Sequence, residues 1–318
     1  MLAAIISLPF LTGCGSNAGK DGEANAEKQK PSNENGGTSI EAKTTDKDLA
    51  DKQATAKREY REYTETIAKC TKAIRLNPKD VTAHRNRGVA YSENGEWDKA
   101  IADYDQAIRL DPKDAATYYN RGTVYSNKDE WDKAIADYSE AIRFDPKDAA
   151  AYYNRGGAYS NKGEWDKVIA DYNKAIRLDP KDATAYSNRG IAYKQKGELD
   201  KAIADYNEAI RLDPKDAITY SNRGGVYVKK GELEKAIADY NEAIWLNLKD
   251  ATVYSNRGGA YARKGEWDKA IADCNEAIRL NPKDADAYKI RSVAYQKKGE
   301  TAKAEEDFKR AKELGYRE

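Results

Sequence analysis

The chain has 318 residues, of which 34% are charged and 40% hydrophobic, and its 55 Lys and Arg residues are balanced by 54 Asp and Glu residues. A net charge of +1 gives no general attraction to nucleic acid or to an anionic membrane, so any charge-driven recognition has to be local. One histidine and three cysteines leave little material for a metal centre, a Cys/His nucleophile or a disulfide framework, which disfavours catalytic functions.

The chain begins with an apolar run over residues 2–11, which is too short to cross a bilayer as a helix but typical of the core of a secretion signal. The tetrapeptide LTGC follows and ends at Cys14. It resembles the lipobox of bacterial lipoproteins, although no Lys or Arg precedes the apolar run. The resemblance implies a signal peptide over residues 1–13 and a lipidated Cys14 that anchors the mature chain to the membrane of a bacterial cell envelope, outside the cytoplasm. An ordinary apolar leader with an incidental cysteine is the alternative.

Residues 14–46 are rich in Gly, Ser, Asn, Lys and Glu and nearly free of large apolar side chains. Such a segment cannot bury enough surface to fold. We therefore predict a disordered tether between the anchor and the rest of the chain.

From Val81 onward a 34-residue unit repeats seven times without insertion, which predicts a repeat architecture. Within each unit an aromatic residue, a small residue and a tyrosine at positions 4, 8 and 11 have the spacing of one helix face. Positions 17, 20, 24, 27 and 30 mark a second helix in the same way. The units are 81–114, 115–148, 149–182, 183–216, 217–250, 251–284 and 285–318.

Turn residues separate these helices. Each unit from the second onward follows an aspartate that can cap the next helix, namely Asp114, Asp148, Asp182, Asp216, Asp250 and Asp284. A glycine at position 15, replaced once by Asp129, is expected to end the first helix in a left-handed conformation.

The units resemble tetratricopeptide repeats, whose characteristic positions 4, 8, 11, 20, 24, 27 and 32 they match almost throughout. The resemblance implies an all-α fold, a right-handed α-solenoid superhelix of helical hairpins whose first helices line a concave groove. Residues 47–80 keep only the second-half landmarks and are interpreted as a degenerate N-terminal repeat. In the last unit Glu305 and Lys312 replace isoleucine, as a terminal helix face without a further repeat requires, so we expect the array to end there.

Position 6 is asparagine in six units, and 100° per residue directs it away from the core and into the groove. Its amide can both donate to and accept from a peptide backbone, and the pattern resembles the asparagine ladder of some tetratricopeptide superhelices. An exposed residue copied by repeat duplication is the alternative. The candidate ladder is Asn86, Asn120, Asn154, Asn188, Asn222 and Asn256.

The C-terminal half of the groove is predicted to be basic. The residues concerned are Lys194 at position 12 and Lys229, Arg263 and Lys297 at position 13. They favour a ligand with acidic residues or a free carboxylate, while an ordinary solvated lysine edge is nearly as good an explanation. A recurring Arg at position 7 and Asp at position 23 are expected to form structural ion pairs of small individual energy.

Four other residues have mainly structural interpretations. His84, Cys70 and Cys274 occupy aromatic core positions and are predicted to be packed. Trp245 lies next to a turn where Leu248 replaces the usual proline, and it is either an outer contact surface or drift within the array.

The sequence thus predicts a non-enzymatic, lipid-anchored scaffold or adaptor that binds partner proteins or extended peptides. No catalytic constellation, cofactor, metal, small-molecule substrate or nucleic acid is indicated. An accessory subunit that regulates an envelope enzyme is the alternative, and an RNA-binding helical repeat is a weaker one.

Overall fold

The computed structural model describes residues 60–247 and 249–317, together with positions 55 and 58. The predicted signal peptide, the lipidated Cys14 and the tether lie outside these residues, as does Leu248. All regular elements in the described part are helices. None of them is long and apolar enough to cross a membrane.

A helix over residues 60–76 is followed by two helices in each of the seven repeats. This confirms the predicted all-α repeat solenoid. The helices are α2 (Val81–Glu93), α3 (Trp97–Leu110), α4 (Ala115–Asn127), α5 (Trp131–Phe144), α6 (Ala149–Asn161), α7 (Trp165–Leu178), α8 (Ala183–Gln195), α9 (Leu199–Leu212), α10 (Ala217–Lys230), α11 (Leu233–Leu246), α12 (Ala251–Lys264), α13 (Trp267–Leu280), α14 (Ala285–Lys297) and α15 (Thr301–Glu313).

Aspartates cap most of these first helices as predicted, since the side chains before α6, α8, α10, α12 and α14 accept backbone N–H groups of the first turn. Asp80, which was not predicted as a cap, does the same before α2. The prediction is wrong for Asp114. Its carboxylate instead accepts hydrogen bonds from the Thr117 hydroxyl and from Nη1 of Arg85, both at 2.6 Å. Asp216 accepts both a threonine hydroxyl and a helix N–H, so the Arg85 guanidinium is the partner that distinguishes Asp114.

The turn inside each hairpin has the predicted left-handed residue. Its φ lies between 71° and 80° at the six glycines, and Asp129 adopts 58° in the one repeat that lacks the glycine. A side chain is disfavoured in this conformation, which explains why glycine recurs there.

The hairpins close over small residues at positions 8, 20 and 27. Ala100 and Ala107 are fully buried, and Tyr104 fills the space beside Gly88. A Cβ atom on Gly88 would lie 2.6 Å from the Tyr104 ring, so glycine is needed for this close approach. The core is therefore a series of small clusters along the array rather than a single central one, and several clusters join neighbouring hairpins, as Ala100 and Tyr104 do with Val124.

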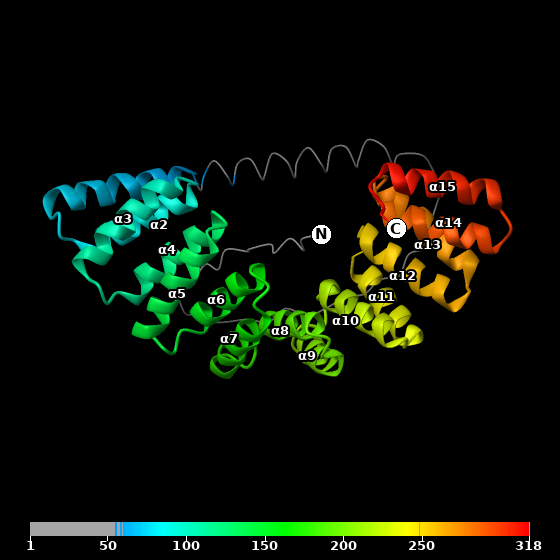
Figure 1. Cartoon of the computed structure of the whole chain (residues 1–318). Helices are drawn as coiled ribbons and strands as arrows, with labels where there is room; N and C mark the ends of the chain where they lie inside the picture. The colour runs from blue at the N-terminus through cyan, green and yellow to red at the C-terminus, as the bar shows by residue number, and fades with distance from the viewer. Residues whose placement is uncertain (1–54, 56–57, 59, 248, 318) are drawn as a thin grey trace, which may run out of the picture. The chain divides into compact units, whose positions relative to one another are not determined.

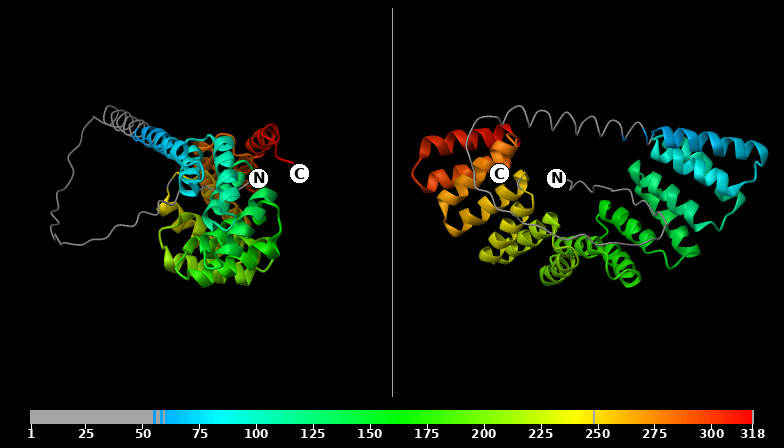
Figure 2. Two further views of the ribbon diagram at one scale, coloured as in Figure 1. Left: turned by 90° about the vertical axis from the view of Figure 1, so that its left-hand side faces the viewer. Right: turned by 180° about the vertical axis from the view of Figure 1, so that it is seen from behind.

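Successive hairpins follow one another along a curved row (Figures 1 and 2). Most consecutive first helices contact each other, α12 and α14 most extensively, whereas consecutive second helices make no comparable contact in the described part. The first helices therefore lie on the inner, concave side, which Figure 1 shows most plainly at α6 and α8. Glu305 and Lys312 are exposed on α15.

Candidate protein-interaction groove

Every complete repeat contains an ion pair that joins its two helices. Nε and Nη2 of the position 7 arginine donate to the two carboxylate oxygens of the position 23 aspartate at 2.6–2.8 Å. The predicted pairing is confirmed. The pairs are Arg87–Asp103, Arg121–Asp137, Arg155–Asp171, Arg189–Asp205, Arg223–Asp239, Arg257–Asp273 and Arg291–Asp307.

These pairs are not exposed as expected, because the aspartates are only 5–7% exposed. The third nitrogen, Nη1, also donates to a side chain on the second helix of the preceding unit. The acceptors are Thr71, Asp105, Ser139, Asn173, Asn207, Asn241 and Asn275. Each guanidinium therefore holds its own hairpin closed and joins it to the hairpin before it.

The position 6 asparagines differ in their surroundings. The amides of Asn154 and Asn188 donate at 2.8 Å to the hydroxyls of Tyr119 and Tyr153, which stand on the first helix of the preceding repeat. Burial raises the pKa of both tyrosines to about 12. These two amides therefore join neighbouring first helices through their N–H groups. Their carbonyl oxygens can still accept a hydrogen bond from a ligand.

The other four amides have no hydrogen-bond partner among the described residues. Asn86 and Asn256 are exposed, while Asn120 and Asn222 are half-buried. The ladder stays a prediction. Its asparagines fall into two groups, those that bind a tyrosine of the preceding repeat and those without a partner among the described residues.

Position 9 was not recognised from the sequence as part of the groove floor. Gly157, Gly225 and Gly259 stand there, and a Cβ atom on any of them would meet only ordinary van der Waals contacts. The glycine at position 8 is needed for packing inside the hairpin. The glycine at position 9 is not needed for packing, and the absence of a side chain there leaves space next to the helix backbone. In the repeat of Gly225, the nearest atoms to that open position are Nζ of Lys194 at 3.6 Å and the hydroxyl of Tyr240 at 3.8 Å.

Lys194 is the half-buried member of the predicted basic set. Burial lowers its pKa, and the positive charge of Lys229 lowers it further. Lys229, Arg263 and Lys297 are exposed, and Nη1 of Arg263 donates to the Val228 carbonyl at 3.4 Å. None of the four cations has a carboxylate partner within the described ranges.

The adjacent lysines at position 14 behave differently, because each pairs with an acidic residue on the second helix of the preceding repeat. These lysines are Lys128, Lys162, Lys196, Lys230, Lys264 and Lys298. The structure therefore neutralises the position 14 row and leaves the cations of positions 12 and 13 unpaired.

The other residues singled out in the sequence differ in how far they are buried. His84 and Cys274 are buried as predicted, at 6% and 0% exposure. Cys70 is only half-buried and lines a pocket, so the prediction of a packed core residue is wrong for it. Trp245 is 73% exposed on α11. The described part contains no cluster of His, Cys, Asp and Glu arranged to hold a metal ion.

Known structures resemble this array. YrrB, described as a tetratricopeptide repeat protein with an unusual peptide-binding site, shares 27% identity, with 61% of this chain and 97% of that chain covered and a TM-score of 0.54. A tetratricopeptide repeat protein from Parabacteroides merdae has 22% identity, coverage of 75% and 94%, and a TM-score of 0.61. PilF of Pseudomonas aeruginosa has 18% identity, coverage of 66% and 97%, and a TM-score of 0.57. The latter two likenesses concern the fold.

No curated protein matches the chain. Two tetratricopeptide repeat models match residues 90–129 and 69–102. A third model, described as the C-terminal domain of cilia and flagella-associated protein 70, matches residues 117–318. Proteins with these repeats are in general non-catalytic scaffolds for protein–protein interaction. Because the third model spans more than half of the chain, the chain belongs to that family of tetratricopeptide repeat proteins.

Proposed function

We propose that this protein is a lipid-anchored scaffold of the bacterial cell envelope that holds an extended, acidic segment of a partner protein along the inner face of its repeats. The unpaired cations of positions 12 and 13 are the observation that carries the proposal. The lysines beside them, at position 14, are all neutralised by the chain itself.

Three features support an extended ligand. First, the inner face presents position 6 amides in successive repeats, and an amide can hydrogen bond to a peptide backbone of any sequence. Second, the glycines at position 9 let a ligand approach the helices closely. Third, a related fold, that of YrrB, is described as having a peptide-binding site.

The acidic preference follows from Lys194, Lys229 and Arg263, which lie on consecutive repeats. An ammonium group that is half-buried and lacks a counter-ion carries a desolvation cost, which a ligand carboxylate would offset. Ligand binding and relief of this cost are then the same event.

The proposal is tested with a fluorescently labelled acidic peptide of Glu, Ser and Gly. Reversal of Lys229, Arg263 and Lys297 to Glu is expected to weaken binding about tenfold or more, because like charges replace unlike ones. The control reverses Lys215, Lys249 and Lys283, exposed in the turns of the same region, with an identical change in net charge. Equal loss in both variants, or no loss in either, would remove the proposed groove site.

The ladder is tested separately by crosslinking and affinity purification from membranes. A variant with Asn154, Asn188 and Asn222 changed to Ala is compared with the wild type, and equal partner recovery would exclude a role for the amides. The proposed anchor is tested with Cys14→Ala, which should move the protein from the membrane fraction to the soluble fraction. Continued membrane association would show that the lipobox interpretation is wrong.

A further inference from the structure

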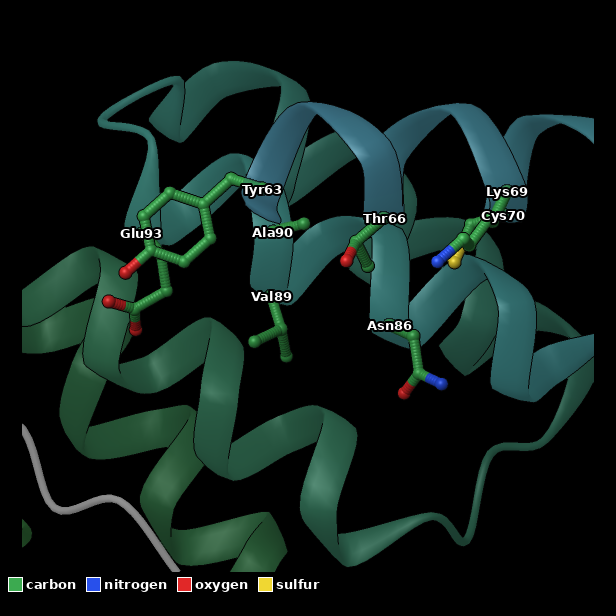
Figure 3. Close-up of a pocket in the computed structure, with 8 residues that line it drawn as sticks. All are labelled: Tyr63, Thr66, Lys69, Cys70, Asn86, Val89, Ala90 and Glu93. Carbon is green, nitrogen blue, oxygen red and sulfur yellow. The ribbon is translucent and has the colours of Figure 1, made fainter. Parts of the chain in front are cut away.

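A pocket lies at the N-terminal end of the array, between the helix over residues 60–76 and α2 (Figure 3). Figure 3 shows that side chains from both helices surround it. Its lining residues are Tyr63, Thr66, Lys69, Cys70, Asn86, Val89, Ala90 and Glu93.

The 34-residue period identifies what this pocket is. Tyr63, Thr66 and Cys70 correspond to positions 17, 20 and 24 of the second helix of a repeat. In the first complete repeat the residues at positions 20 and 24 are Ala100 and Tyr104, which are 0% and 1% exposed because their own first helix covers them. Thr66 and Cys70 are only half-buried. The pocket is therefore the seat of a first helix, and we call it the N-terminal seat.

Within the described residues, the turn that would return the chain over this seat is missing. In the complete repeats a left-handed residue at position 15 ends the first helix, as Gly95 does with φ at 74°. Arg61 stands at the corresponding place, and both it and Tyr60 are helical. The helix thus continues through the point where every complete hairpin reverses direction.

The charge at position 23 of the seat is also reversed. Position 23 is Asp in all seven complete repeats, where it binds the arginine at position 7 of the covering helix. Here position 23 is Lys69, which lines the seat, is exposed and has no ion pair among the described residues. A covering helix with arginine at that place would bring two like charges together, whereas one with an acidic residue would form a pair.

We propose that the N-terminal seat binds an amphipathic helix of a partner protein that carries Asp or Glu where the first helices of this chain carry arginine. A second copy of the chain is disfavoured, because each of its seven first helices would place arginine against Lys69. This docking site shares Asn86 with the proposed ladder but none of the groove cations, so the inference stands whether or not an acidic peptide binds in the groove.

The first test uses two synthetic peptides of residues 149–162, one unaltered and one carrying Arg155→Glu. With the full-length protein, fluorescence anisotropy is expected to show about tenfold tighter binding of the acidic peptide. Lys69→Asp should invert that preference by restoring the ion pair of the complete repeats. No binding of either peptide, or an unchanged preference in Lys69→Asp, would overturn the proposal.

The second test uses Cys70 as a reporter of occupancy, with the buried Cys274 as an internal reference. Site-resolved mass spectrometry after iodoacetamide treatment is expected to show that Cys70 reacts faster than Cys274 and that the acidic peptide slows it. If Cys70 in the free protein reacted as slowly as Cys274, the chain would cover its own seat and the proposal would be wrong. An alkylation rate at Cys70 that the peptide does not change would exclude it as well.

Discussion

Arg121 binds Asp137 through two parallel hydrogen bonds of 2.7 Å, and its third nitrogen donates to Asp105 of the preceding repeat at 2.5 Å. Burial opposes the charge of this guanidinium, but the two carboxylates outweigh it and raise the pKa of Arg121 above its usual value. One side chain thus closes a hairpin and connects two repeats. Because a repeat array depends on its nearest-neighbour contacts, this position couples folding along the row.

The first prediction concerns the same contact at Arg189 and Asp205. Either Arg189→Leu or Asp205→Ala should lower the free energy of unfolding by about 3 kcal/mol, since each leaves one buried group without its partner. The double variant Arg189→Leu with Asp205→Ala should recover part of that loss, because no unpaired charge remains. Urea unfolding followed by circular dichroism measures the coupling. Two single losses that simply add in the double variant would contradict a direct pair.

Changing either of two adjacent glycines on α10 to alanine should alter the stability of the protein, in opposite directions. Gly224→Ala is expected to destabilise the protein by about 1–3 kcal/mol, because the new Cβ atom would lie 2.9 Å from the Tyr240 ring. Gly225→Ala is the matched control, and its Cβ atom would meet nothing closer than 3.6 Å. It should stabilise the helix by about 0.5–1 kcal/mol. Thermal unfolding of the two variants tests this, and a shift in the same direction for both would show that position 8 is not specially packed.

The left-handed turn of the second repeat gives a prediction of increased stability. Asp129 holds a φ of 58°, which costs a residue with a side chain about 1 kcal/mol relative to glycine. Asp129→Gly should therefore raise the melting temperature, and Gly163→Asp at the same place in the next repeat should lower it. Differential scanning calorimetry measures both. If Asp129→Gly proved destabilising, the aspartate side chain would have to make a stabilising contact of its own.

The sequence predicted the hairpins, their turns and the arginine–aspartate pairs well, because these depend on local spacing within one unit. It did not predict the burial of the pairs or the link from Arg121 to Asp105, which joins different repeats. Contacts of that kind depend on the angle between one hairpin and the next. The length of the repeat in the sequence does not determine this angle. The contact of Asp114 was missed for a different reason, since its partner Arg85 lies 29 residues earlier on α2, at the other end of the same unit.

The groove was predicted in part. The basic side chains at position 13 follow from helix geometry, but the open floor at position 9 does not, because adjacent glycines at positions 8 and 9 look alike in the sequence. The structure separates them by what each Cβ atom would touch. The sequence signal for the N-terminal seat is Lys69, because position 23 is aspartate in all seven complete repeats.

The last prediction is the pH dependence of acidic peptide binding at Lys194. Burial and the nearby charge of Lys229 lower the pKa of Lys194, while a bound carboxylate would favour the ammonium form and raise it again. Binding should therefore take up a proton, and affinity should fall as the pH rises through the lowered pKa of Lys194, before ordinary lysines lose their charge. Fluorescence anisotropy titrations with the acidic peptide of Glu, Ser and Gly measure this fall.

Lys194→Arg provides the matched control, because a guanidinium stays charged over the whole range. In that variant the affinity should persist to higher pH. The stability of the protein without peptide gives an independent check, because its dependence on pH should have the opposite sign to that of peptide binding. A lysine whose pKa is lowered on folding adds stability above its unfolded pKa and loses that contribution as the pH falls through its folded pKa. Lys194→Met should consequently increase stability at neutral pH while weakening peptide binding. A variant that bound the acidic peptide as well as the wild type would show that this ammonium group does not contact the ligand.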